Sequence, residues 1–270
     1  MRRSRLALCI AATIAAVATL TGCTASTKSA STKSASTEST STKSTAAATP
    51  SAPTAGDGCP SLRTGGKAVS FGSGIAGYMY GTGAIGVVFG HESNGTACDW
   101  MQEAQTLGQQ GYRTLALDFN GYGASTPSGH LFSQDIVDGT TFLGTQGATS
   151  IVLIGSSMGG SAVLAATPSV TLPVKAVIAL SPPAAFAGSN ALAAAPKISV
   201  PLLMICGNYD TAIIDDVKNI YAAATATKQK KLLLLDTATH GRLLVQPGVG
   251  SEPQAIDAFN SFLKTYAPIT

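Results

Sequence analysis

The stretch Ile151-Val-Leu-Ile-Gly155-Ser156-Ser157-Met158-Gly159-Gly160-Ser161-Ala162 decides the fold that we expect for this chain of 270 residues. Its first half is a short apolar run, typical of a strand that is covered on both faces. Its second half is a run of small residues that opens a helix. Glycines stand two residues before and two residues after Ser157, so a strand and a helix can approach each other closely there. The stretch therefore predicts a strand, a sharp turn at Ser157 and a helix.

Ser157 is the residue of this turn that we expect to do chemistry. Its hydroxyl would stand at a helix N-terminus, where free N–H groups and the helix dipole favour developing negative charge. A glycine-rich strand–helix turn with an idle serine is the alternative interpretation. The two interpretations differ in what else the chain must supply, because a serine hydroxyl is a poor nucleophile without a base.

His240 is the best candidate for that base among the three histidines of the chain. It lies in Asp236-Thr-Ala-Thr-His240-Gly241, directly after the last apolar strand and before the C-terminal helix. His130 falls in a loop rich in serine, glycine and proline, where a solvated role is expected. His91 precedes the nucleophile in the chain, and packing within its loop is at least as plausible for it as a catalytic part.

Asp210 is the expected acid that orients the imidazole and stabilises its charged form. It closes Val200-Pro-Leu-Leu-Met-Ile-Cys-Gly-Asn-Tyr-Asp210, at the carboxyl end of an apolar strand, where functional groups gather in open α/β sheets. Asp215 and Asp216 are better explained as residues of the first turn of a helix. Asp236 stays an alternative acid, although it would end the same strand that precedes the base.

The remaining pattern predicts an α/β fold, with a mostly parallel central sheet of about eight strands flanked by helices. Short turns between the first strands indicate that this edge of the sheet is antiparallel. The segment from Ser181 to Val200 has room for a loop or one short helix and not for a large cap domain. We expect strands at 68–71, 75–80, 85–89, 113–118, 150–154, 176–180, 202–206 and 231–235, and helices at 99–110, 133–143, 158–166, 215–224 and 252–266.

These motifs, taken in chain order, resemble the α/β-hydrolase superfamily over about residues 59 to 268. Gly111-Tyr-Arg-Thr-Leu-Ala-Leu-Asp118 with Gly121-Tyr-Gly-Ala-Ser125 resembles the family's fourth-strand region, and Gly155 to Gly160 resembles its nucleophile turn. Pro201 to Asp210 resembles its acid strand, and His240-Gly241 its histidine loop. The chain is most similar to compact, secreted, dienelactone-hydrolase-like bacterial members.

This resemblance implies a serine hydrolase that cleaves carboxylic esters by a Ser-His-Asp acyl-enzyme mechanism through Ser157, His240 and Asp210. A peptidase, thioesterase or acyltransferase on the same fold is an alternative, since these enzymes share the motifs. A non-catalytic surface-binding lipoprotein is a further alternative, because fold alone does not decide function.

The loop Gly90-His91-Glu92-Ser93-Asn94-Gly95 departs from the family pattern, because Glu92 stands where a glycine is common. By position, the backbone N–H of Ser93 would join that of Met158 in an oxyanion hole, or the N–H of Glu92 if the register slips. A carboxylate beside an oxyanion would be unfavourable unless Glu92 points away or is neutralised. Glu92 is therefore the residue that argues most strongly against the hydrolase interpretation.

The first residues predict an export signal, with three arginines in the first five positions and an apolar run from Leu6 to Leu20. Leu20-Thr-Gly-Cys23 resembles a bacterial lipobox, which implies a signal peptide at 1–22 and a lipid on Cys23. Residues 23–57 form a disordered tether rich in serine, threonine, lysine and alanine, and 58–270 form the hydrolase domain. We thus expect a protein at the cell surface, anchored to the outer face of the cytoplasmic membrane, or secreted.

The composition of the chain limits the kinds of partner and cofactor that we expect for it. Once the signal and tether are set aside, the folded part has a net charge of about −2, so nucleic acid is not an expected partner. No metal cluster, phosphate loop or dinucleotide motif appears, so we expect no metal and no cofactor. A small-molecule, lipid or polymer ester is the expected substrate, the membrane is contacted through the anchor, and a monomer is favoured. In an exported protein, Cys59 and Cys98 could pair, with Cys206 buried in the core.

Overall fold

The computed structural model describes residues 54–248 and 252–269. Eight strands form one sheet in the order β1-β2-β4-β3-β5-β6-β9-β10. In chain order these strands are β1 (Gly66–Phe71), β2 (Ile75–Tyr80), β3 (Ile85–Gly90), β4 (Arg113–Leu117), β5 (Ser150–Ser156), β6 (Val174–Leu180), β9 (Leu202–Gly207) and β10 (Lys230–Leu235). The pairs β1–β2 and β2–β4 are antiparallel, and every other neighbouring pair is parallel. The predicted sheet with one antiparallel edge is confirmed.

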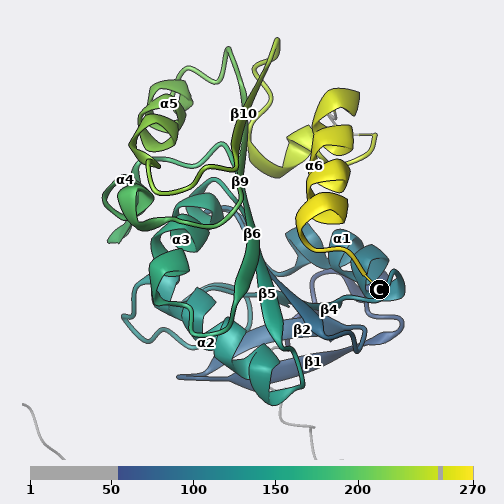
Figure 1. Cartoon of the computed structure of the whole chain (residues 1–270). Helices are drawn as coiled ribbons and strands as arrows, with labels where there is room; N and C mark the ends of the chain where they lie inside the picture. The colour runs from purple at the N-terminus through teal and green to yellow at the C-terminus, as the bar shows by residue number, and fades with distance from the viewer. Residues whose placement is uncertain (1–53, 249–251, 270) are drawn as a thin grey trace, which may run out of the picture. The chain divides into compact units, whose positions relative to one another are not determined.

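Helices cover both faces of the sheet (Figure 1). One face carries α2 (Phe132–Thr145), α3 (Met158–Ala166), α4 (Ala191–Ala194) and α5 (Ile214–Ala223), and the other carries α1 (Cys98–Gln109) and α6 (Pro253–Tyr266). Two buried apolar clusters correspond to these two faces. The central strands are buried along their whole length, which explains why their sequences are continuously apolar rather than alternating.

The insertion between β6 and β9 is small. It holds a two-stranded hairpin, β7 (Ala185–Phe186) and β8 (Ser189–Asn190), followed by the single turn of α4 and a short 3₁₀ turn. The remaining short elements are 3₁₀ turns at Pro60–Leu62, Thr167–Ser169 and Gly241–Leu244. The described residues therefore carry no large cap over the carboxyl edge of the sheet, as predicted.

The N-terminal segment packs onto the domain before the boundary expected from composition. Ala55 and Gly56 are buried, and Gly56 lies beside the side chains of Met101 and Tyr78. Residues 54–57, which composition assigns to the tether, therefore contact the folded part. The predicted signal peptide, Cys23 and the tether up to residue 53 lie outside the described residues.

Candidate active site

The predicted site residues lie in loops at one edge of the sheet. Strands β3, β5, β6, β9 and β10 run parallel, so their carboxyl ends share that edge. The loops that follow these strands carry His91 with Glu92, Ser157, Ser181, Asp210 and His240. Ligands of open α/β sheets gather at this edge.

Ser157 occupies the turn between β5 and α3 in a strained conformation, with φ 50° and ψ −119°. A side chain on either flanking glycine would not fit. A Cβ on Gly155 would lie 2.2 Å from the carbonyl oxygen of Gly159, and one on Gly159 would lie 2.2 Å from that of Gly90. The two glycines are thus required by close backbone approach, and Ser157 keeps a positive φ that only glycine adopts freely.

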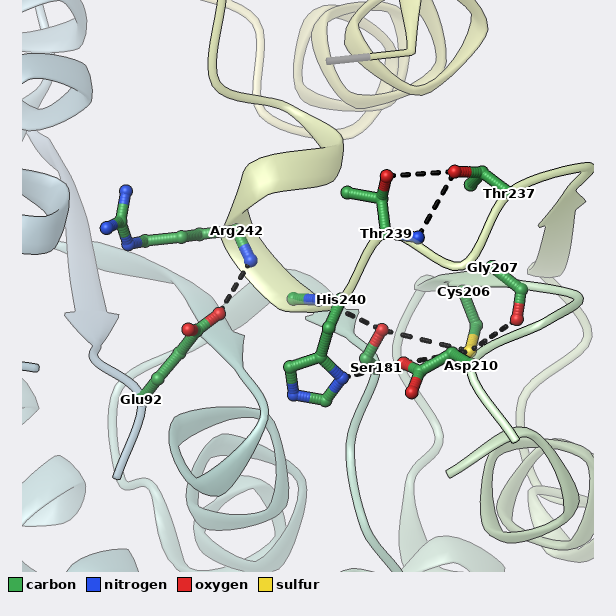
Figure 2. A network of polar contacts seen from close by, with 10 residues as sticks. Glu92, Ser181, Cys206, Gly207, Asp210, Thr237, Thr239, His240 and Arg242 are labelled. Carbon is green, nitrogen blue, oxygen red and sulfur yellow. Dashed lines mark hydrogen bonds and ion pairs between the residues drawn. The ribbon is translucent and has the colours of Figure 1, made fainter. Parts of the chain in front are cut away.

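His240 and Asp210 are in direct contact. His240 Nδ1 lies 2.6 Å from Asp210 Oδ2, and Figure 2 shows the imidazole ring turned toward this carboxylate. The Asp210 side chain is 9% exposed and that of His240 is 36% exposed. With Nδ1 held by Asp210, Nε2 is the ring nitrogen left for proton transfer. The alternatives are not part of this contact: Asp236 is exposed and faces the Tyr209 hydroxyl, and His130 is exposed in its loop.

The turn of Ser157 and the loop of His240 meet at the end of β6. The backbone N–H of Ser157 donates to the carbonyl of Leu180 at 2.8 Å. The next residue, Ser181, accepts the backbone N–H of Gly241 at 3.1 Å. The structure thus brings His240 and Asp210 into contact and places Ser157 on the same edge of the sheet, and among the described residues no hydrogen bond joins Ser157 Oγ to the His240 ring.

The loop after β3 lies against the first turn of α3, because the N–H of Gly159 donates to the carbonyl of His91 at 3.1 Å. Met158 is the first residue of α3, so its N–H has no acceptor within the helix. Ser93 is exposed in a turn that closes through the hydrogen bond from the Gly95 N–H to the Glu92 carbonyl at 3.0 Å. The backbone of Glu92 is engaged with the Asp99 carboxylate.

The Glu92 side chain points toward the loop of His240 rather than hanging free in the site. Its Oε1 accepts the backbone N–H of Arg242 at 2.8 Å (Figure 2). The approach is close enough that a Cβ on Gly241, which has φ 60°, would lie 1.9 Å from Glu92 Oε1. The carboxylate therefore accepts a hydrogen bond from a backbone donor of the His240 loop.

His91 is a packing residue of its loop. Its ring is fully buried between Phe119 and Tyr122, at centroid distances of 4.9 and 5.1 Å. Nε2 accepts the N–H of Phe119 at 3.0 Å, and Nδ1 lies 2.6 Å from the carbonyl of Glu92. Burial lowers the pKa of His91 to about 4, with the Glu92 carbonyl acting in the opposite direction. The ring is therefore neutral and holds two loops together through both nitrogens.

A cavity of about 250 Å³ lies on the far side of the His240 loop, between α1, the 3₁₀ turn after His240, and α6. The Arg242 side chain lines it and pairs with Asp99, with Nε 3.5 Å from Oδ1. Burial raises the pKa of Asp99 and that of Glu103, which also lines the cavity. Neither Ser157 nor His240 lines this cavity, so it is separate from the candidate site.

The cysteines divide by environment. Cys59 and Cys98 form a disulfide whose Cα atoms are 5.8 Å apart, and it fastens the N-terminal segment to the first residue of α1. Cys206 is a free buried thiol at the end of β9. Burial raises its pKa to about 11, so it is a neutral thiol at neutral pH. In the part of the chain that the structure describes, no three His, Cys, Asp or Glu residues form a metal-binding group.

None of the helices within residues 54–248 and 252–269 has both the length and the apolar character needed to cross a bilayer.

Ser181 is the polar residue of this edge that sequence reasoning missed. It is fully buried, has φ 44° and hydrogen-bonds the residue after His240. The only hint in the sequence is its place directly after a buried strand, which many structural serines share. Its contact to Gly241 spans 60 residues and is visible only in the folded chain.

The sequence profile described as "alpha/beta hydrolase fold" matches residues 73–199. No curated protein matches the chain by sequence. Among solved structures, the Pyrococcus furiosus esterase Pf2001 is similar with a TM-score of 0.65 and 20% identity, over 77% of this chain and 93% of that one. The dienelactone hydrolase of Anabaena variabilis is similar with a TM-score of 0.57 and 24% identity, over 74% and 95%.

The monoacylglycerol lipase of Paleococcus ferrophilus is similar with a TM-score of 0.59 and 16% identity, over 70% of this chain and 98% of that one. At these identities the likeness concerns the fold. The strand order, the turn after β5 and the matching profile agree with one another. The chain has the α/β-hydrolase fold.

Proposed function

We propose that this protein is a serine hydrolase that cleaves carboxylic esters, with Ser157 as nucleophile, His240 as general base and Asp210 as the acid that orients it. The observation that carries the proposal is the 2.6 Å contact between His240 Nδ1 and Asp210 Oδ2, on the sheet edge where Ser157 holds its strained turn. A strained serine and an oriented imidazole are two of the parts that acyl transfer requires.

In this mechanism His240 Nε2 takes the proton of Ser157 Oγ as the oxygen attacks the ester carbonyl carbon. The Nδ1–H bond to Asp210 stabilises the imidazolium that forms. The proton then passes from Nε2 to the leaving alcohol oxygen, and an acyl-enzyme is left on Ser157. Water, deprotonated by His240, attacks the acyl carbonyl, releases the carboxylic acid and restores the serine.

The N–H of Met158 is the first donor that we propose for the oxyanion, since α3 offers it no partner. Ser93 supplies the second donor in this proposal, because the Glu92 backbone is engaged with Asp99. The commitment of the Glu92 carboxylate to the Arg242 N–H supports a functional hole, since it holds that charge on a partner.

Two features favour ester hydrolysis over a purely binding role. The His240 side chain is 36% exposed and the insertion after β6 is short, so water reaches the site readily. The similar structures include an esterase, a dienelactone hydrolase and a monoacylglycerol lipase, which share the cleavage of carboxylic esters. A carboxylic ester is accordingly the substrate class that we propose.

The test is labelling with a fluorophosphonate probe, which reacts with activated serines. Wild type should be labelled, and Ser157→Ala and His240→Ala should not, while all three keep the same circular dichroism spectrum. Hydrolysis of short p-nitrophenyl esters should follow the labelling. A folded wild type that takes up no probe and turns over no ester would overturn the proposal.

We also propose that the protein is exported and lipid-anchored through Cys23. The Cys59–Cys98 disulfide supports export, because such bonds persist in oxidising compartments. The sequence from Arg2 to Cys23 supports the signal and the anchor. Wild type expressed in a bacterial host should fractionate with membranes and carry lipid on Cys23 by mass spectrometry, and Cys23→Ala should be released. A wild type without lipid would contradict the anchor.

A further inference from the structure

Ser181 carries a conformational cost. It directly follows β6 with φ 44°, in the left-handed region, and its side chain is fully buried. Its backbone N–H donates to the carbonyl of Ile205 on the neighbouring strand at 2.9 Å, which fixes its position. A non-glycine residue with such a φ is strained relative to glycine. Because this serine is strained and completely buried, we expect its hydroxyl to have a structural role.

The hydroxyl holds the loop of the base. Ser181 Oγ accepts the N–H of Gly241 at 3.1 Å, and Glu92 Oε1 accepts the N–H of Arg242 at 2.8 Å. Two consecutive N–H groups directly after His240 thus bind side-chain oxygens from two different strand ends (Figure 2). Gly241 has φ 60° and no side chain that could restrain its backbone. The two hydrogen bonds therefore restrain the backbone directly after His240.

The same hydroxyl reaches toward the acid. Ser181 Oγ lies 3.8 Å from Cys206 Sγ, a distance at which it donates a weak hydrogen bond to sulfur. The thiol lies 3.4 Å from the carbonyl of Gly207 and 3.9 Å from Asp210 Oδ2. Because burial keeps Cys206 protonated at neutral pH, it is a donor toward these oxygens and adds no charge beside the carboxylate.

We propose that Ser181 is a positioning residue that, together with Cys206, holds the backbone of His240 in register with the Asp210 carboxylate. This inference rests on the proposed function for its catalytic consequence. Acyl transfer requires the base to lie within a fraction of an ångström of its productive position. If the loop is no longer held at Gly241, His240 occupies that position less often and fewer bound substrates react. The bond acts on the base and not on substrate, so it affects kcat rather than KM.

The decisive variant is Ser181→Gly, which removes the hydroxyl and relieves the positive φ, so the relieved strain partly offsets the lost hydrogen bond and the variant should still fold. The matched control is Ser125→Ala. Ser125 is also buried and its Oγ also accepts a backbone N–H, that of Ala76 at 2.7 Å, but it does not touch the His240 loop. Cys206→Ser keeps a donor in place of the thiol, and Cys206→Ala removes it.

For Ser181→Gly we expect kcat to fall about tenfold with KM within about twofold of wild type, the size expected for one lost hydrogen bond that matters only to the base. Ser125→Ala should keep wild-type kcat even if its melting temperature drops. Cys206→Ala should lose a few-fold in kcat, and Cys206→Ser should recover most of that loss.

A readout that needs no turnover is the Nδ1–H proton resonance of His240, recorded on ¹⁵N-histidine protein and assigned with His240→Gln. In Ser181→Gly this resonance should move upfield or broaden through exchange, because its bond to Asp210 is weakened. Ser125→Ala should leave it unchanged. The resonance separates the two claims: a wild type inert to probe and ester sinks the proposed function, while the resonance still tests the positioning.

The positioning role is overturned if Ser181→Gly keeps both wild-type kcat and the wild-type resonance. It is equally overturned if Ser125→Ala loses as much kcat as Ser181→Gly, since the loss would then reflect general destabilisation. Should Ser181→Gly not fold, the cysteine pair decides: equal kcat in Cys206→Ala and Cys206→Ser would overturn the link to Asp210.

Discussion

Glu92 and Arg242, 150 positions apart in the chain, are joined by a hydrogen bond in which the backbone N–H of Arg242 donates to Glu92 Oε1 over 2.8 Å. The bond connects the loop after β3 to the loop after β10, and so connects the proposed oxyanion region to the proposed base. It explains how a glutamate is tolerated at a position where a free carboxylate would oppose an oxyanion. The charge has a fixed partner, and it serves to place the His240 loop.

This relationship predicts different results for two substitutions of Glu92. Glu92→Gln keeps an oxygen that accepts the Arg242 N–H, so ester turnover should stay within about threefold of wild type. Glu92→Ala leaves that N–H without its acceptor and should lower kcat by about tenfold. Steady-state kinetics on a short p-nitrophenyl ester measure both. A large gain in kcat for Glu92→Gln would mean instead that the negative charge itself hinders the reaction.

His91 predicts a pH dependence of stability. Its pKa is about 4 in the folded protein and 6.5 when unperturbed, so below about pH 6.5 the unfolded chain binds a proton that the native ring refuses. The stability that the neutral ring contributes is complete above about pH 6.5 and is lost as pH falls toward 4.

The measurement is the free energy of unfolding by urea at about pH 7 and at about pH 5, for wild type and for His91→Gln. Wild type should lose about 2 kcal/mol more than the variant over this range. The comparison between the two proteins is needed because burial raises the pKa of Asp118 and Asp135, whose protonation acts in the opposite direction. If the free energy of unfolding changed equally with pH in both proteins, His91 would not contribute to the pH dependence of stability.

The strained turn predicts that catalysis and stability conflict at Ser157. Ser157→Gly relieves the φ of 50° and should be more stable than Ser157→Ala by about 1 kcal/mol, although both lack the proposed nucleophile. Thermal or urea unfolding of the two variants measures this, and neither should react with a fluorophosphonate. If Ser157→Ala were the more stable of the two, the turn would not be strained in solution.

The disulfide predicts a sensitivity to reductant. The bond closes a loop with a sequence separation of 39, for which the chain-entropy relation gives about 4 kcal/mol of stabilisation. Adding a thiol reductant should lower the melting temperature of wild type to that of the double variant Cys59→Ala/Cys98→Ala. The double variant itself should not respond to reductant, and any response would point to another redox-active group.

Local sequence was enough to predict the main elements and to name Ser157, Asp210 and His240 as candidates, of which the structure brings Asp210 and His240 into contact. Strands and helices show in runs of apolar residues and in glycine-rich turns, because burial on both faces and tight turns each limit which residues fit. Ser157 and Asp210 follow buried strands and His240 follows the half-buried β10, and the carboxyl ends of parallel strands must meet at one edge. The hairpin β7–β8 was not predicted, since strands of two residues are too short to show an alternation of apolar and polar residues.

What the sequence by itself determined is therefore the layered fold and the loops that carry the candidate site residues, since both follow from the order of apolar runs and turns. Only the tertiary structure decided which atoms of those loops contact one another. The direction of the Glu92 carboxylate, the neutral packing role of His91 and the contact of Ser181 with Gly241 depend on partners 28 to 150 positions away. A hydrogen bond requires donor and acceptor within about 3 Å, and no local pattern encodes such a distance between remote segments.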